Sequence, residues 1–194
     1  MAGMSKHRPD QNEPTVDDAG PGGGVHRRAP LPVAPARGHL IVPEDVAVTT
    51  LTALRGFLGP DGRHEGIVFW AGRQDGNDQL VASAIVPRAV HGRGFVHVDA
   101  NEVGEAAHQA RTRRLVILGQ VHSHPGTDTL HSDADDDLVL MAREATFSLV
   151  VANYGDGGIT PAGGAGVHQL QDNRWVRISD ADTSLIVVPA AVHT

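Results

Sequence analysis

The chain has 194 residues, a formal net charge of −7 at pH 7 and no cysteine. This length allows one domain with a sizeable core, and the lack of cysteine excludes disulfides, thiolate metal ligands and a cysteine nucleophile. The negative charge argues against nucleic acid as a partner. No apolar stretch is long enough for a membrane span and no signal peptide is visible, so we expect a cytoplasmic protein without a membrane partner.

The first 37 residues predict a disordered tail. They are polar and rich in proline and glycine, and they show neither a helical nor a strand period. Such a segment buries too little apolar surface to offset the entropy lost on ordering. We therefore expect the folded domain to occupy residues 38–194.

A first helix is predicted to begin at Pro43, because proline suits a helix N-terminus and the acidic Glu44 and Asp45 follow in the first turn. Apolar residues then recur at helical spacing until Gly59, and these are Val48, Leu51, Leu54 and Leu58. Strands are predicted at residues 66–71 and 80–90. A cluster of turn-forming residues between these strands favours a β-hairpin.

A second helix is predicted from Asp99, which has capping-box spacing to Glu102. Its apolar face consists of small residues, which are Val103, Ala106, Ala107 and Ala110. A buried strand is predicted at residues 115–122, followed by a third helix that starts at Ser132. The apolar positions of this third helix are Leu138, Met141, Ala142 and Ala145.

The remaining segments complete an α/β domain. Residues 147–151 predict another buried strand, 155–166 form a glycine-rich loop, and 167–178 read as a terminal hairpin. The expected fold is a mixed β-sheet with about three helices packed on it. His131 and His168 have no ligand spacing, and we expect both to be ordinary surface or partly buried residues.

Two histidines near the end of the strand at 115–122 suggest a metal site. His122 and His124 share one face, because alternate residues of a strand point the same way, and Pro125 then ends the strand. Asp135 follows at the start of a predicted helix. Two imidazoles and one carboxylate form a three-ligand set for zinc that leaves a fourth position open, as in catalytic sites.

Each of these residues also has a plainer interpretation. The chain has 12 histidines, so a His-x-His pair can arise by chance. The spacing of Ser132 and Asp135 fits a helix capping box. Glu65, which precedes the apolar run at 66–71, could be an exposed loop carboxylate.

The order and spacing of these residues resemble the motif of the JAMM (MPN+) zinc metalloproteases, in their bacterial branch. That motif is His-x-His-Pro, then a serine and an aspartate, and here it falls on His122, His124, Ser132 and Asp135. The family also has an upstream glutamate at the entrance of a strand, a place that Glu65 takes. The resemblance covers the chain from about residue 40 to its end.

The resemblance implies a cytidine-deaminase-like JAB/MPN fold and a Zn²⁺ ion held by His122, His124 and Asp135. It further implies that Glu65 is the catalytic base for the zinc-bound water and that Ser132 stabilises the oxyanion. The expected activity is that of a peptidase or isopeptidase acting at the C-terminus of a ubiquitin-like or sulfur-carrier protein that ends in Gly-Gly. A homodimer is compatible with this interpretation.

Two alternatives come from other functional classes. A catalytically silent MPN-type scaffold would bind partners, but such proteins usually lack one or more ligands, and this chain has all of them. A RadC-like, DNA-associated protein would share a similar His-x-His-Pro block, but the acidic charge argues against it.

Overall fold

The computed structural model describes residues 27, 29–137 and 143–189. The larger sheet consists of β1 (Val33–Ala34), β2 (Leu40–Pro43), β5 (Ile67–Asp75), β6 (Asp78–Ile85), β9 (Val116–Ser123), β10 (Phe147–Val151), β11 (Gly166–Gln171), β12 (Arg174–Ile178) and β13 (Leu185–Val188). Two small hairpins pair β3 (Leu58–Gly59) with β4 (Gly62–Arg63), and β7 (Val90–Gly92) with β8 (Phe95–His97). The helices are α1 (Glu44–Arg55), α2 (Ala100–Thr112), α3 (Asp133–Asp137) and α4 (Ala181–Ser184), with 3₁₀ turns η1 (Asn153–Gly155) and η2 (Pro161–Gly163). No helix within these ranges is long and apolar enough to cross a membrane.

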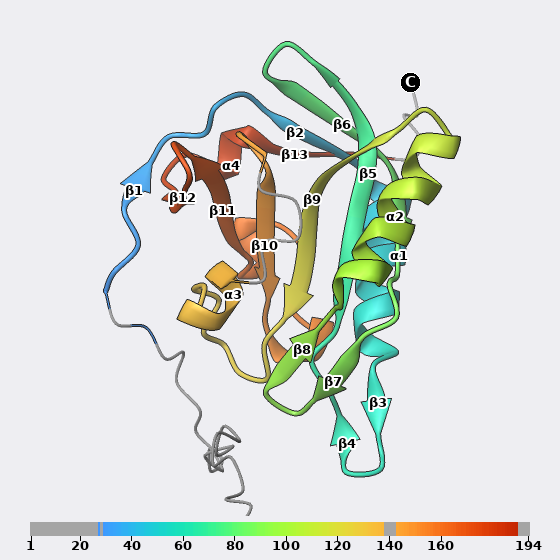
Figure 1. Cartoon of the computed structure of the whole chain (residues 1–194). Coiled ribbons are helices and arrows are strands. Elements are labelled where there is room, and N and C mark those ends of the chain that lie inside the picture. Colours follow the sequence, from blue (N-terminus) through green and yellow to red (C-terminus); the bar gives the residue numbers. More distant parts are fainter. Residues whose placement is uncertain (1–26, 28, 138–142, 190–194) are drawn as a thin grey trace, which may run out of the picture.

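The larger sheet is mixed, as the sequence predicted, and it is also curled (Figure 1). Its strand order is β1-β12-β11-β10-β9-β5-β6-β2-β13. The central strand β9 runs antiparallel to β5 and parallel to β10, so His122 lies between Ile67 and Val150. The predicted hairpins β5–β6 and β11–β12 are both present. His122 therefore lies on the middle strand of the sheet rather than at its edge, and His124 follows directly after that strand.

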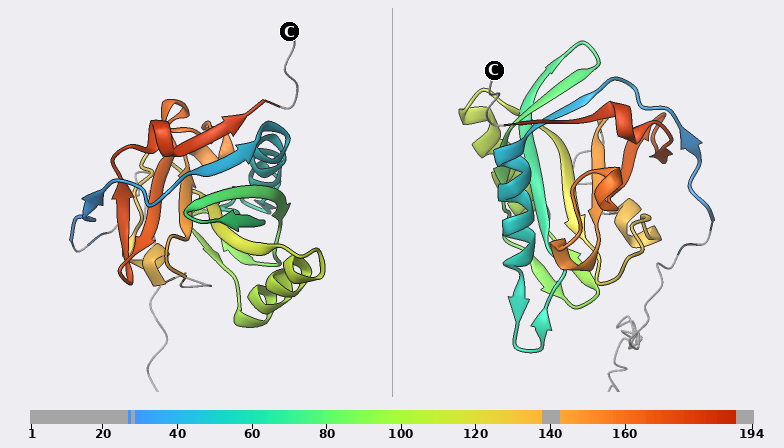
Figure 2. Two further views of the ribbon diagram at one scale, coloured as in Figure 1. Left: turned by 90° about the horizontal axis from the view of Figure 1, so that it is seen from above. Right: turned by 180° about the vertical axis from the view of Figure 1, so that it is seen from behind.

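Helices cover both faces of the sheet. Seen from above, α1 lies on one side of β5 and β6, whereas α2 and α3 lie on the other side (Figure 2). The face under α1 carries the larger apolar core, which includes Trp70, Val121 and Leu149. The opposite face carries a smaller apolar cluster under α2, with Ile67 and Phe69. His122 shares this second face, since residues paired across strands point to the same side.

Helix α2 has the N-cap and the buried face that its sequence predicted. Asp99 is the N-cap and accepts hydrogen bonds from the N–H groups of Asn101 and Glu102. The predicted face of small residues is the buried one. Helix α1 is shorter than predicted, because it ends at Arg55 and Leu58 belongs to the β3–β4 hairpin.

The buried face of α1 matches the predicted one only in part, because Leu54 is completely buried and Leu51 packs against the larger core. Val48 is 58% exposed, and the side chains that pack on the sheet include Ala47 and Thr50. The Thr50 hydroxyl accepts a hydrogen bond of 2.8 Å from the indole N–H of Trp70. Small residues therefore share the buried side with Leu51 and Leu54, and the spacing of large apolar residues identified this side only in part.

The folded domain begins earlier in the chain than residue 38. Residues 29–37, which we call the N-terminal arm, run along the outer edge of the β11–β12 hairpin. Within the arm, β1 pairs in parallel with β12, so that Val33 lies beside Arg177. Arg37 forms ion pairs with Glu144 and Asp172. The last residues of the predicted tail are thus folded, whereas residues 1–26 lie outside the described part of the chain.

The third helix and the C-terminal end also depart from the sequence-based prediction. Helix α3 begins one residue after Ser132, but Leu138, Met141 and Ala142 lie outside the described residues. Ala145 has a positive φ of 65°, so it does not continue a helix. At the C-terminal end, β13 pairs in parallel with β2, a pairing that no local signal indicated.

Candidate metal centre

Strand β9 brings the two motif histidines together. His122 and His124 are both buried, and their Nε2 atoms lie 3.2 Å apart. The Nδ1 atom of His124 lies 2.9 Å from the backbone carbonyl of Asp128. That carbonyl can only accept, so Nδ1 carries the proton and Nε2 keeps its lone pair free toward the centre.

Helix α3 supplies the third group. The Oδ1 atom of Asp135 lies 3.3 Å from His122 Nε2, and its Oδ2 atom lies 3.3 Å from His124 Nε2. The ligand atoms of the three residues all lie within 4.8 Å of one another, and all three side chains are buried. Two imidazole nitrogens and one carboxylate form a donor set that suits Zn²⁺ and leaves room for a fourth ligand.

The charges within this cluster favour an ionised aspartate. Burial tends to raise the pKa of Asp135, but the charges and hydrogen bonds of His122 and His124 outweigh burial and hold this pKa well below its usual range. The pKa of His124 is raised, because Asp135 and Glu65 overcome the lowering effect of burial. A metal ion bound here would compete with protons for the imidazole nitrogens.

Ser132 and Asp135 form the capping box that the sequence allowed. The backbone N–H and the hydroxyl of Ser132 both donate to Asp135 Oδ2, at 2.6 and 2.8 Å. In return, the N–H of Asp135 donates to Ser132 Oγ at 3.1 Å. The capping arrangement and the metal-site arrangement therefore coexist, because the carboxylate that caps also faces the two histidines.

Glu65 is buried beside the histidines and is not an exposed loop carboxylate. It precedes β5, where the carbonyl of Gly66 accepts a hydrogen bond of 3.0 Å from the N–H of Ser123. This antiparallel register sets Glu65 beside His124. Burial raises the pKa of Glu65 to about 8, an effect that Asp135 adds to and His124 opposes. A carboxyl with such a pKa next to a metal-type cluster is a typical candidate for acid–base chemistry.

Two further histidines lie deep beneath the cluster, contrary to expectation. His131 and His168 are completely buried and stack with ring centroids 4.0 Å apart. His131 Nε2 lies 2.9 Å from the hydroxyl of Ser148, and its Nδ1 lies 3.2 Å from Asp136. Burial lowers the pKa of both histidines.

A signal for one of these two residues was available in the sequence. His168 alternates with Val167, which packs in the larger core, so strand periodicity places His168 on the same face as the metal cluster. His131 has no comparable signal, because it lies in the loop before α3.

Comparison with known proteins gives the family. Residues 52–160 match the prokaryotic homologs of the JAB domain. A protein of Sinorhizobium fredii, named probable metalloprotease y4jG, is 32% identical over 117 residues, which are 58% of this chain and 70% of that protein. This family match spans the residues that carry Glu65, both histidines, Ser132 and Asp135.

Comparison with solved structures gave further matches. One is the solution structure of a protein from Desulfitobacterium hafniense, with a TM-score of 0.59 and 18% identity over 79% of this chain and 96% of that one. A JAB1/MPN domain protein from Archaeoglobus fulgidus has a TM-score of 0.43 and 17% identity over 77% of this chain and 96% of that one. Since the family match covers more than half of the sequence, the chain belongs to the prokaryotic JAB family, in agreement with the resemblance to JAMM proteases in its sequence.

Proposed function

We propose that the protein is a zinc-dependent peptidase or isopeptidase that hydrolyses an amide bond without a covalent intermediate. The observation that carries this proposal is the buried cluster of His122, His124 and Asp135 with Glu65 beside it. A bound Zn²⁺ would supply a water of lowered pKa and a Lewis acid for the carbonyl oxygen. The name of the Sinorhizobium relative supports the same reaction class.

Glu65 would carry out both proton transfers, and Ser132 would stabilise the negative charge that develops on the carbonyl oxygen. Glu65 takes a proton from the water as the water oxygen attacks the carbonyl carbon. The same carboxyl then gives this proton to the amide nitrogen as the C–N bond breaks, so the amine leaves in neutral form. The Ser132 hydroxyl would turn from Asp135 Oδ2 to donate its hydrogen bond to the carbonyl oxygen, which becomes negatively charged in the tetrahedral intermediate.

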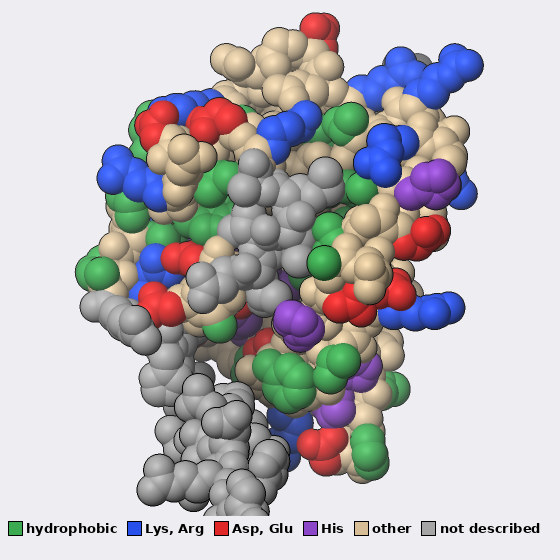
Figure 3. All heavy atoms as spheres, in the orientation of Figure 1, with side chains coloured by type: hydrophobic (Ala, Val, Ile, Leu, Met, Phe, Trp, Pro, Cys, Tyr) green, Lys and Arg blue, Asp and Glu red, His purple; other side chains and the backbone are tan. Residues whose placement is uncertain are grey.

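The proposed substrate is a ubiquitin-like or sulfur-carrier protein with a Gly-Gly C-terminus. An extended tail without side chains can lie beside a strand and reach a buried centre. The β7–β8 hairpin lies beside Glu65, because the N–H of Glu65 donates to the carbonyl of Gly92 in this hairpin. The exposed surface of the hairpin supports a protein substrate. This hairpin exposes Val90 and Phe95, and hydrophobic side chains gather in its part of the surface in Figure 3.

The proposal is tested with the zinc-loaded full chain and a fusion in which a peptide follows the Gly-Gly end of a sulfur carrier. We expect mass spectrometry to show release of the peptide by the wild type and none by Glu65→Gln. Glu105→Gln, which changes an exposed glutamate on α2, is the matched control and should cleave normally. Stoichiometric zinc binding without cleavage of any Gly-Gly fusion would instead favour a binding role for this centre.

A further inference from the structure

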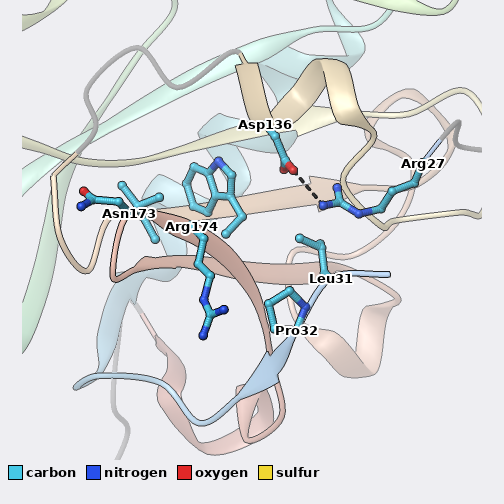
Figure 4. Close-up of a pocket in the computed structure, with 8 residues that line it drawn as sticks. Arg27, Leu31, Pro32, Asp136, Asn173 and Arg174 are labelled. Atoms are coloured by element: carbon cyan, nitrogen blue, oxygen red, sulfur yellow. Dashed lines mark hydrogen bonds and ion pairs between the residues drawn. The ribbon is translucent and has the colours of Figure 1, made fainter. Parts of the chain in front are cut away.

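Arg27 reaches the loop that carries Ser132 and the start of α3. Its Nη1 atom donates to the backbone carbonyls of His131 and Ser132, at 3.1 and 3.4 Å. Its Nη2 atom donates to Asp136 Oδ2 at 2.8 Å, the contact drawn in Figure 4. One guanidinium thus binds three acceptors that lie on both sides of Asp135 in the sequence.

This ion pair is shielded from solvent. The side chains of Arg27 and Asp136 are only 16% and 26% exposed, so their attraction is screened less than that of a surface pair. The second carboxylate oxygen of Asp136 lies 3.2 Å from His131 Nδ1. The segment from His131 to Asp136 is therefore held from one side by Arg27 and from the other by the buried histidine.

Helix α3 needs such external support. It spans only Asp133–Asp137, which is too short to be stable through its own hydrogen bonds. The capping bonds of Ser132 fix the Asp135 side chain relative to the helix, but they do not fix the helix relative to β9. Among the contacts described above, those of Arg27 and His131 fix the backbone of this segment.

We propose that Arg27 is a positioning residue for the metal centre. It holds the backbone on both sides of Asp135 so that the carboxylate stays within reach of His122 on β9 and of His124 just after it. This inference rests on the metal centre of the proposed function. It gives a residue just before the N-terminal arm a role at the site, although the composition of that region predicted only a disordered tail.

The arm is anchored well enough to hold Arg27 in place. The carbonyl of Pro32 accepts a hydrogen bond of 2.8 Å from the N–H of Arg177, and the N–H of Ala36 donates to Asp180 at 2.8 Å. A hollow of about 380 Å³ lies between the arm, α3 and the β11–β12 hairpin (Figure 4). Arg27, Asp136 and Arg174 all line it.

Arg174 provides the matched control. It lines the same hollow and carries the same charge, but it points away from Asp136 (Figure 4). The decisive measurement is the Zn²⁺ affinity of the full chain, by competition with a chromophoric chelator, after circular dichroism has shown that each variant is folded. We expect Arg27→Ala to bind zinc about 10- to 100-fold more weakly, the usual effect of losing a group that orients a metal ligand. Arg174→Ala should bind like the wild type.

Two additional measurements separate positioning from general stability. Arg27→Lys keeps the charge beside Asp136 but lacks the planar fork, so it should recover part of the lost affinity. Co²⁺ in place of Zn²⁺ gives a visible absorption spectrum that depends on ligand geometry. Compared with the wild type, this spectrum should differ in Arg27→Ala and be unchanged in Arg174→Ala. Deletion of residues 1–26 should preserve zinc affinity, whereas deletion of residues 1–29 should reduce it as Arg27→Ala does.

The outcomes distinguish this inference from the proposed function. A wild-type chain that takes up no stoichiometric zinc would overturn the metal centre itself. A wild-type chain that binds zinc, together with a folded Arg27→Ala variant of equal affinity and unchanged Co²⁺ spectrum, would overturn only the role of Arg27. Equal losses in Arg27→Ala and Arg174→Ala would also overturn it, because the effect would then be one of charge alone.

Discussion

Glu65 and His124 shift each other's pKa at the place where β5 begins and β9 ends. The imidazole lowers the pKa of the carboxyl, while the carboxylate raises that of the imidazole. Burial dominates for Glu65 and leaves its pKa at about 8. The residue is thus poised to exchange a proton near neutral pH.

The first prediction concerns this carboxyl. Glu65→Gln keeps the shape of the side chain but removes its ability to accept a proton. We expect turnover to fall by about 10²- to 10⁴-fold, the usual contribution of a general base, while zinc remains bound. Steady-state kinetics and metal analysis of one preparation check both statements, and full activity in a zinc-loaded variant would remove Glu65 from the mechanism.

The second prediction concerns the ligands. His122→Ala removes one of three groups whose ligand atoms lie within 4.8 Å of one another, so stoichiometric zinc should be lost. His108→Ala, which changes an exposed histidine of α2, should retain zinc. Inductively coupled plasma mass spectrometry of the dialysed proteins measures the difference. Equal zinc content in the two variants would contradict the assignment.

The third prediction concerns Ser132. Ser132→Ala removes a hydroxyl that donates to Asp135 Oδ2 and accepts from the N–H of Asp135. The loss of this cap should cost about 1 kcal/mol of stability, and turnover should fall more than zinc binding does. Ser132→Thr keeps the hydroxyl and should restore most of the activity. Thermal melts and kinetics of the three proteins compare the two effects, and unchanged turnover in Ser132→Ala would argue against an oxyanion role.

The fourth prediction concerns the loop that leads to α3. A Cβ atom added at Gly166 would lie 1.9 Å from the carbonyl oxygen of Thr129, so Gly166→Ala must displace either β11 or this loop. We expect a lower melting temperature and weaker zinc binding. Gly126→Ala is the control in the same loop, because its Cβ would meet no atom of the described residues within 4 Å. Differential scanning calorimetry with and without zinc would show the contrast, and similar melting temperatures for both variants would contradict it.

Local signals predicted the parts of the fold that depend on neighbours in the sequence. The cap at Asp99 and the turn between β5 and β6 have fixed conformations that a short stretch determines. The pairing of β13 with β2 joins distant segments, so no local pattern could indicate it. The N-terminal arm was missed for the same reason, because its polar, proline-rich sequence is held by contacts with distant segments, among them β12 and Asp180.

In the candidate site, too, local patterns predicted some residues, whereas contacts between distant segments could not be predicted. Strand alternation was enough to place His122 and His124 on one face, and the family motif added Asp135 and Glu65. Arg27 carries no such signal, because it lies 109 residues from Asp136 and its partners include two backbone carbonyls. Recognition of a ligand pattern in a sequence therefore identifies the groups that bind but misses the residues that hold them.

The stacked histidines below the centre make the domain sensitive to acid. Burial holds the pKa of His131 and His168 below the value of 6.5 that each has when exposed, so the folded state keeps both rings neutral. The unfolded chain takes up protons at these residues as the pH falls below 6.5, which favours unfolding. Chemical denaturation between pH 8 and 5 should show stability falling by up to about 1.4 kcal/mol per pH unit for each histidine. Acid unfolding would also disperse the cluster of His122, His124 and Asp135, because the ring of His131 lies 5.7 Å from that of His122.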